Sequence, residues 1–314
     1  MHAVILERNK LVGRKVARLF LATGATATTV EEPAQVASVL DGERATVLCA
    51  DTFDGDLVAE HVRARPGLAG LLWTAEPLRR SLRYVVECPG IDHVFGRRDF
   101  ESAPRDWEIL MVARRLLAPC APPQLPAYLD WGFTAFEQEL AGSADRDPAV
   151  ARVQALVGGL GMPRRVVEMF GELAHELIMN AIYDAPADSQ GHARYASDRK
   201  ATIVLDPGER PTLRAGTDGS RLVLQVHDPF GRLERRHVVD GLARGLAGDG
   251  GVTVDRTHGG AGLGMMVCHN ASSAMFFDVS RGRHTEVTAL FELDLNLREF
   301  RTQARSLHFW ARPE

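Results

Sequence analysis

The 314-residue chain has no long apolar run and no apolar segment of the kind that begins a secreted protein. A membrane-spanning helix needs about 20 predominantly apolar residues, and no uninterrupted stretch approaches that length. The start MHAVILERNK carries charges where a secretory signal would have its apolar core. We therefore expect a cytoplasmic protein that does not insert into a membrane.

The chain also lacks a basic run and a cysteine pattern. A net charge of -4 leaves no electrostatic footprint for a polyphosphate backbone, which argues against nucleic acid as a partner. The four cysteines, Cys49, Cys88, Cys120 and Cys268, show neither CxxC nor Cys/His ligand spacing. This predicts reduced thiols rather than a disulfide framework or a zinc site.

What the chain has is enough apolar sequence for two cores, with 45% hydrophobic and 25% charged residues. The stretch APCAPPQLP, with four prolines in nine residues, excludes both a helix interior and a central strand. We place a linker at 118–126, a first domain at 1–117 and a second at 127–314.

The first domain alternates strand-type and helical patterns, and LVGRKVARLFLATG is an example of the latter. The strand-type runs are 3–6, 25–30, 45–50, 70–73 and 91–95. Such alternation predicts an α/β fold with a doubly wound parallel sheet. Ligands of these sheets bind beyond the carboxyl ends of the strands, which points to Glu7, Asp51, Thr74 and Arg97.

These residues make 1–117 resemble a response-regulator receiver domain. Asp51 follows VLCA as the phosphoacceptor follows the third receiver strand, and WTA supplies the hydroxyl position after the fourth. Two positions differ: Glu7 stands beside Arg8 where receivers carry an acidic pair for Mg²⁺, and FGRRDF offers arginine where they carry lysine. Arginine does not reproduce the compact ammonium of lysine. Asp51 is either a phosphoacceptor or an ordinary loop aspartate, and we expect a receiver-like domain used for docking or dimerisation.

The second domain is predicted to be an α+β sandwich, one helical layer on one sheet. We expect helices near 128–140, 147–158, 163–184, 234–246 and 262–275, and strands near 200–206 and 220–227, followed by MFFDVS and TEVTALFEL.

The helix at 163–184 carries two faces. Its apolar residues recur at three- and four-residue steps and predict a core-facing side. Its polar residues recur at four-residue steps and stack along the other side: Glu172, Glu176, Asn180 and Asp184. The stripe is either a solvated surface or one wall of a site.

Two loops could complete such a site. The glycines of HGGAGLGM, directly before a helical run, allow close backbone approach and aim N–H groups at an anion. The strand VLQVHDPFG ends in Asp228, and a buried aspartate there can accept a hydrogen bond from an exocyclic amine. Taken singly, each is also compatible with an ordinary turn.

In this order, the three elements resemble the GHKL superfamily of ATP-binding domains over roughly 145–295. ELIMNA resembles the N-box, DPFG the adenine-reading box, GGAGLGM the second glycine box, and RGRHTEVTALFEL the closing hairpin. The resemblance implies Mg²⁺ and ATP as cofactors, with Asn180 as the metal ligand and Glu176 as the catalytic base that orients water or an attacking hydroxyl. It places further residues around the nucleotide: Asp184, Asp228 and Gly231, then Gly260, Gly262, Leu263 and Gly264 by the phosphates, and Thr285 on the adenine side.

The adenine box departs from the usual D-x-G-x-G form, since Phe230 and Arg232 hold its glycine positions. No helical hairpin with an exposed histidine precedes the N-box, as it would in a histidine kinase. The domain instead looks closest to anti-sigma serine kinases. Two functions stay open: an ATP-dependent protein kinase or ATPase of bacterial-type signalling, and a non-catalytic scaffold of pseudo-receiver and pseudokinase domains. Both imply a signalling protein as partner, and homodimerisation is open in both.

Overall fold

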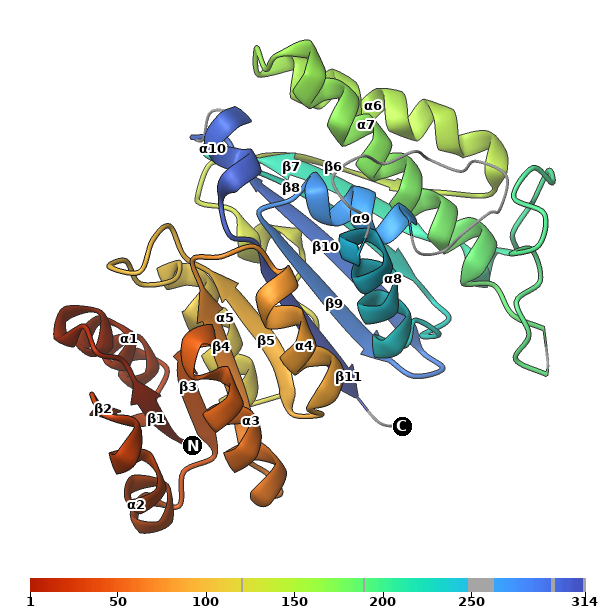
Figure 1. The fold of residues 1–314 in the computed structure, drawn as a ribbon. Helices are drawn as coiled ribbons and strands as arrows, with labels where there is room; N and C mark the ends of the chain where they lie inside the picture. Colours follow the sequence, from red (N-terminus) through yellow and green to blue (C-terminus); the bar gives the residue numbers. More distant parts are fainter. Residues whose placement is uncertain (120, 189, 248–262, 295–296, 313–314) are drawn as a thin grey trace. The chain divides into compact units, whose positions relative to one another are not determined.

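The chain, seen in a computed structural model, forms two compact units (Figure 1). The structure describes residues 1–119, 121–188, 190–247, 263–294 and 297–312. Unit 1 comprises Met1–Ala121 and Glu299–His308, and unit 2 comprises Pro122–Arg298 and Phe309–Glu314. The sequence had assigned all of 127–314 to the second domain, whereas the segment 299–308 packs with the first.

Unit 1 has a parallel sheet with strand order β2-β1-β3-β4-β5. All five predicted strands are confirmed: β1 (His2–Leu6), β2 (Thr26–Val30), β3 (Val47–Asp51), β4 (Ala69–Thr74) and β5 (Ile91–Gly96). Helices alternate with them: α1 (Lys10–Ala22), α2 (Pro33–Glu43), α3 (Gly55–Ala64), α4 (Arg79–Glu87) and α5 (Asp106–Leu117). This is the doubly wound order shared by flavodoxin-like and receiver domains, whose sites lie where the strand order reverses.

Local signals explain where these helices begin. The Asn9 side chain accepts hydrogen bonds from the backbone N–H groups of Leu11 and Val12, which caps α1. Proline occupies the first turn of α2, where its missing N–H costs nothing. The central strand β3 is buried along its whole length, as expected of a strand covered on both faces.

A sixth strand, which the sequence did not predict, joins unit 1 at the β5 edge. It is the first part of β11 (Ser306–Arg312), which follows α10 (Leu297–Thr302) and pairs antiparallel with β5 through Leu307 and His308. Nε2 of His308 lies 2.6 Å from Oε1 of Glu108, and neither side chain is exposed to solvent. The chain thereby covers this edge of its own sheet.

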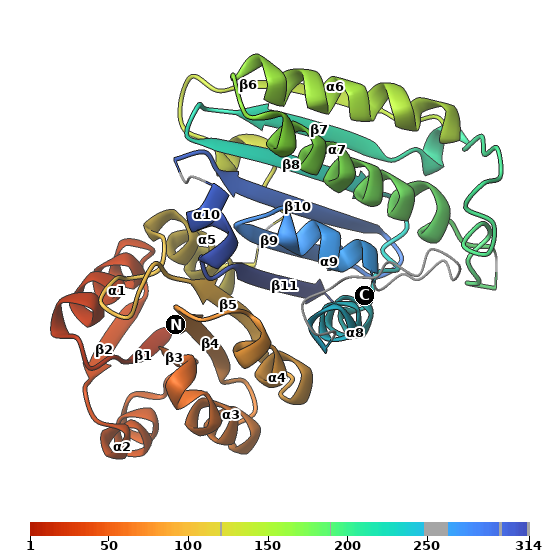
Figure 2. The same ribbon diagram turned by 45° about the horizontal axis from the view of Figure 1, so that its top comes forward.

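Unit 2 has an antiparallel sheet with strand order β9-β10-β8-β7-β6. Its strands are β6 (Thr134–Glu139), β7 (Thr212–Thr217), β8 (Arg221–Asp228), β9 (Ala274–Ser280) and β10 (His284–Glu292). One face is covered by α6 (Arg146–Gly159), α7 (Arg164–Met179), α8 (Arg235–Ala247) and α9 (Leu263–Asn270), as Figures 1 and 2 show. The arrangement is a two-layer α+β sandwich.

Two of the predicted elements of unit 2 are wrong, and β7 was missed. The segment 128–140 follows a short 3₁₀ turn at Leu125–Tyr128 and forms strand β6 instead of a helix. Gly132, with φ of 89°, interrupts any helix there, and pairing of β6 with β7 supplies the backbone hydrogen bonds. The expected strand at 200–206 is an irregular segment with one isolated bridge, Val204 to Gly142. Within the described residues, no helix is long and apolar enough to cross a membrane.

Candidate functional sites in the two units

The strand ends of unit 1 bring two acids and one arginine together. Glu7 follows β1, Asp51 ends β3, and Arg97 follows β5, so all three lie at the carboxyl edge of the sheet. Nη2 of Arg97 lies 2.7 Å from Oδ2 of Asp51, and its Nη1 lies 3.2 Å from Oε2 of Glu7. Only 3% of the Arg97 side chain is exposed, so one buried guanidinium forms ion pairs with both carboxylates.

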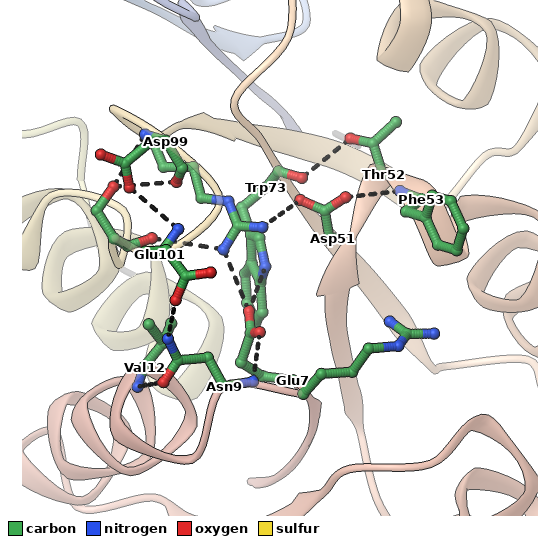
Figure 3. A network of polar contacts seen from close by, with 12 residues as sticks. Glu7, Asn9, Val12, Asp51, Thr52, Phe53, Trp73, Asp99 and Glu101 are labelled. Atoms are coloured by element: carbon green, nitrogen blue, oxygen red, sulfur yellow. Dashed lines mark hydrogen bonds and ion pairs between the residues drawn. The ribbon is translucent and has the colours of Figure 1, made fainter.

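The remaining oxygens of these carboxylates also have partners, as Figure 3 shows. The indole N–H of Trp73 donates to Glu7 over 3.2 Å, and the backbone N–H of Asn9 donates to its other oxygen over 3.0 Å. The backbone N–H of Phe53 donates to Asp51 over 2.8 Å. Burial raises the pKa of Asp51, and the Phe53 N–H and Arg97 act against that rise. All four carboxylate oxygens of the cluster thus have a partner, whereas Nε of Arg97 is buried without one among the described residues.

The neighbouring positions of the receiver pattern are used elsewhere. Arg8, which stands where a second acid would be, turns away and pairs with Asp54 at 2.9 Å. The Thr74 hydroxyl accepts the backbone N–H of Glu76 over 3.0 Å and closes the turn after β4. A phosphoacceptor site needs carboxylates free to bind Mg²⁺, whereas here the guanidinium of Arg97 lies on both of them.

In unit 2, the predicted polar stripe is interrupted by a change of helix type. The α-helix ends at Met179, and Asn180–Asp184 continues as a π-helical turn, closed by the N–H of Ala185 on the carbonyl of Asn180 at 2.9 Å. The last step of the predicted stripe, from Asn180 to Asp184, therefore lies on a π turn instead of an α-helix, and Asp184 stays close enough to Glu176 for that carboxylate to raise its pKa. Single π turns inside α-helices are frequent at functional sites.

Asp184, at the end of this turn, is paired with Arg199. Burial raises the pKa of Asp184 despite that arginine. Asn180 is partly buried, and no hydrogen bond of its side chain occurs within the described parts of the chain. The Asp184 carboxylate is thus already paired, whereas the side-chain amide of Asn180 is available for a ligand.

The catalytic candidate Glu176 lies against the start of α9. A Cβ atom at Gly264 would collide with Oε2 of Glu176, so the carboxylate sits at the first turn of that helix. A helix N-terminus carries a positive potential, which favours an anionic group there. Burial raises the pKa of Cys268 further along α9, and Glu176 adds to that rise. The predicted phosphate-binding residues Gly260 and Gly262 lie outside the described residues, as does the side chain of Leu263.

The adenine-reading candidate Asp228 ends β8, directly opposite Thr285 on β10. Its carboxyl accepts the backbone N–H of Phe230 over 2.9 Å. Burial raises the pKa of Asp228 to about 6, although Phe230 and the nearby His227 act in the opposite direction. The Thr285 hydroxyl is close enough to favour the ionised carboxylate, but it lies outside hydrogen-bond geometry and has no partner within the described residues.

The two residues after Phe230 have structural roles. Gly231 has φ of 62°, and a Cβ there would collide with the carbonyl oxygen of Ser280 in the β9–β10 turn. Only glycine fits this position, and it serves the hairpin contact. Arg232 donates to backbone carbonyl oxygens of the segment after the π turn, at 3.3 Å to Ala185 and 2.8 Å to Gly191. Arg232 thus ties the DPFG loop to the segment after the π turn.

A cavity of about 460 Å³ opens beside Glu176. It is lined by residues of α6, α7 and α9: Gln154, Glu168, Gly171, Glu172, His175, Glu176 and Val267. Asn180, Asp184 and Asp228 are not part of this lining, so Glu176 is the one predicted site residue, among those that the structure describes, that lines the cavity. Among the described residues, no group of three or more His, Cys, Asp or Glu side chains is placed to hold a metal ion.

Three arginines that shape these sites were not given their roles by the sequence: Arg97, Arg199 and Arg232. The sequence did show arginine in place of lysine after β5 and in place of glycine in the adenine box. It could not show that Arg97 would reach both Glu7 and Asp51, because that depends on the order of three strands.

Three solved structures of response regulators align with the N-terminal part of this chain. A response regulator from Thermotoga maritima aligns with 37% of this chain and 97% of its own, at 11% identity and a TM-score of 0.33. An atypical orphan response regulator with a phosphorylation-independent regulatory mechanism aligns at 12% identity and a TM-score of 0.31, over 38% of this chain and 93% of its own. An orphan response regulator of H. pylori aligns at 14% identity and a TM-score of 0.30, over 38% of this chain and 94% of its own. No family model and no curated protein matches the sequence. The receiver-like assignment of unit 1 rests on its strand order.

Proposed function

We propose that this chain is a signal-transduction protein whose unit 2 binds Mg·ATP as GHKL domains do. One observation carries the proposal: Glu176 of the N-box helix lies against the first turn of α9, where the glycine box ends. Residues 88 positions apart in the sequence, Glu176 and Gly264, are thereby in contact. The order of motifs in the sequence alone did not require that contact.

The side chains near β8 are suited to a purine. Asp228 presents a buried carboxyl at the strand end, and Thr285 opposite it has a buried hydroxyl without a partner among the described residues. A buried polar atom without a hydrogen bond costs about 1–3 kcal/mol, and an exocyclic amine with a bridging water would satisfy both groups. Asn180 would hold Mg²⁺ through its free amide, with Gly260, Gly262, Leu263 and Gly264 bordering the phosphates.

Mg·ATP would supply a transferable phosphoryl group whose charge the metal partly neutralises. Glu176 would orient the attacking water or protein hydroxyl by accepting its proton. In the structure its carboxylate lies where the α9 N-terminus favours an anion, so we expect it to move aside when phosphates bind. A replacement that keeps the charge of Glu176 and one that removes it should therefore differ in their effect on turnover.

Unit 1 serves in this proposal as a docking domain that does not accept phosphate. Arg97 already occupies both carboxylates, and receiver chemistry would require displacing a buried guanidinium from two ion pairs. The role left to the unit is recognition of a protein partner through its surface.

A second candidate function is a scaffold that binds partners without catalysis. Arg232 favours it, because its hydrogen bonds to the segment after the π turn fix the adenine box where a flexible glycine would otherwise stand. The scaffold predicts that Glu176→Gln changes nothing measurable. The kinase or ATPase predicts near-normal nucleotide binding and turnover lower by about 10²-fold or more for the same variant.

The first test is thermal denaturation of the full chain with Mg·ATP, with Mg·ADP and with ATP in EDTA. Nucleotide at about a hundred times its Kd should add roughly 2.7 kcal/mol of stability, and Asn180→Ala should reduce the shift through loss of the metal. Arg165→Ala, at an exposed position on the same helix and outside the cavity lining, is the matched control. The absence of any shift at millimolar nucleotide, with or without EDTA, would refute the proposal.

A further inference from the structure

The sheet of unit 1 has two edges, and the chain treats them differently. At the β5 edge its own strand β11 is added and fixed by the buried contact between His308 and Glu108. At the other edge, β2 pairs with β1 and with no other described strand. The β2 edge is therefore available for a further strand.

Hydrogen bonds to β1 show which backbone groups point outward. The N–H of Thr26 donates to Met1, and the carbonyl of Val30 accepts the N–H of Glu7, at 3.1 and 3.0 Å. Because successive residues of a strand alternate in direction, the N–H and C=O groups of Ala27 and Thr29 point away from the sheet. These four groups can pair with an added strand.

The β2 edge lacks the charges, the proline and the bulge that proteins use to prevent strand addition. Its sequence TATTV contains no charged residue and no proline, and its register with β1 runs without a bulge. Exposed edges of this kind bind extended peptides in several recognition domains.

A groove of about 470 Å³ runs along this edge. Ala27 and Thr29 of β2 form one side, and an outer face of α1 forms the other through Leu11, Arg14, Ala17, Arg18 and Leu21. Leu11 is 75% exposed and Leu21 is 52% exposed. The wall from α1 thus has apolar residues at both ends and two arginines between them.

Of the four cations of this helix, the two arginines are those without an ion pair in the described part of the chain. Lys10 pairs with Glu31 at 3.3 Å and Lys15 pairs with Asp106 at 2.7 Å. Arg14 and Arg18 form no ion pair within the described residues. The groove therefore has a local positive charge on a protein whose net charge is -4.

We propose that the β2 edge and the arginine face of α1 together bind an extended acidic segment of a partner protein, added as a strand beside β2. Arg14 and Arg18, four residues apart, are separated by about 6 Å along the helix. Alternate residues of a strand are about 6.6 Å apart and share one face. Two carboxylates at positions i and i+2 of the segment would each meet one arginine, and apolar residues beyond them would cover Leu11 and Leu21.

The backbone edge distinguishes a peptide from a nucleic acid. A nucleic acid could use the two arginines, but it would leave the outward groups of Ala27 and Thr29 without strand partners and cover two leucines with phosphate. A peptide satisfies all three features. The inference concerns unit 1 alone and holds whether or not unit 2 binds nucleotide.

The test uses the full chain and a fluorescent peptide, Leu-Thr-Glu-Thr-Glu-Thr-Leu, with the lysine version Leu-Thr-Lys-Thr-Lys-Thr-Leu as its charge control. The glutamate peptide should bind the wild type, and the lysine peptide should bind at least tenfold more weakly. Arg18→Glu should weaken the glutamate peptide at least tenfold and strengthen the lysine peptide. Arg79→Glu, the same charge change at an exposed arginine of α4, should leave both unchanged.

Ala27→Pro separates the backbone contribution from the charge. It removes one outward N–H and leaves pairing with β1 in place, so the fold, checked by circular dichroism, should persist while peptide binding falls. Failure of the glutamate peptide to bind at millimolar concentration overturns the proposal, as does equal binding by wild type and Arg18→Glu. Binding of a single-stranded oligonucleotide that Arg18→Glu abolishes and Ala27→Pro leaves intact would assign the groove to nucleic acid instead.

Discussion

Each unit buries an aspartate at the end of a central strand, and the two aspartates differ in what surrounds them. Asp51 of unit 1 faces Arg97, which it shares with Glu7. Asp228 of unit 2 accepts the backbone N–H of Phe230 but has no arginine or lysine partner among the described residues, and the Thr285 hydroxyl opposite it has no hydrogen bond there. A buried carboxylate that is already paired holds a fold together, whereas one left unpaired is available to a ligand.

The difference has an energetic cost on the side of unit 2. Burial raises the pKa of Asp228 from 3.8 to about 6, which corresponds to about 3 kcal/mol of destabilisation at neutral pH. In unit 1 the guanidinium opposes the same effect of burial on Asp51. We interpret the cost at Asp228 as retained for recognition of a ligand.

We expect the largest effect from replacing Arg97, whose guanidinium forms ion pairs with both Glu7 and Asp51. Arg97→Met keeps the length of the side chain and leaves Glu7 and Asp51 buried and unpaired. We expect the free energy of unfolding of unit 1 to fall by about 3–5 kcal/mol, measured by urea denaturation of the full chain. Arg98→Met, at the exposed neighbouring position, should change it by less than about 0.5 kcal/mol. Equal effects of the two variants would show that the cluster does not hold the unit together.

We expect Asp228→Asn to raise the free energy of unfolding of unit 2. This change should be somewhat smaller than the loss that Arg97→Met causes in unit 1. Because the folded-state pKa is raised, folded wild type retains a proton between pH 3.8 and about 6 that the unfolded chain has lost, so its stability falls as pH rises through that window. The variant lacks this titration. It should be more stable than wild type at pH 7, by up to about 3 kcal/mol, and show no nucleotide-induced rise in Tm.

A lower stability of Asp228→Asn at pH 7, with a steeper loss above pH 6, would contradict this account of the carboxyl. The experiment is a pair of Tm profiles from pH 4 to pH 8, with and without Mg·ATP.

The alternation of strands and helices was enough to predict all five parallel strands of unit 1, because buried parallel strands read as short apolar runs. The sequence failed at β6, whose pairing with β7 overrides a helical pattern, and at β11, a strand joined to a unit that begins some 300 residues earlier. Such elements are defined by distant partners. Of the site, Glu176 and Asp228 could be named from motif spacing, whereas the reach of Arg97 and Arg232 depends on tertiary packing.

Arg232→Gly is expected to have a moderate effect. It places a glycine where the adenine box of the proposed GHKL domain would have one, and it removes the hydrogen bonds to Ala185 and Gly191. We expect unit 2 to lose about 1–2 kcal/mol and Mg·ATP to bind more tightly, since the loop is then free to adjust. Titration calorimetry measures the affinity, and a weaker affinity would mean that Arg232 contributes to the nucleotide site.

For phosphorylation of unit 1 by a small phosphodonor, we expect no effect at all. Incubation with acetyl phosphate and Mg²⁺ should leave the mass of the protein unchanged, because Arg97 occupies both carboxylates of unit 1. A gain of one phosphoryl group that Asp51→Asn abolishes would show that the ion pairs open and that unit 1 works as a receiver.

The contrast between a paired and an unpaired site is tested most directly by hydrogen exchange of the full chain, read by mass spectrometry with and without Mg·ATP. The account predicts slower exchange at 176–185, 228–232 and 264–268 of unit 2. It predicts no change at 5–9, 51–54 and 96–99 of unit 1. Unchanged exchange throughout unit 2, or protection confined to the strand ends of unit 1, would contradict it.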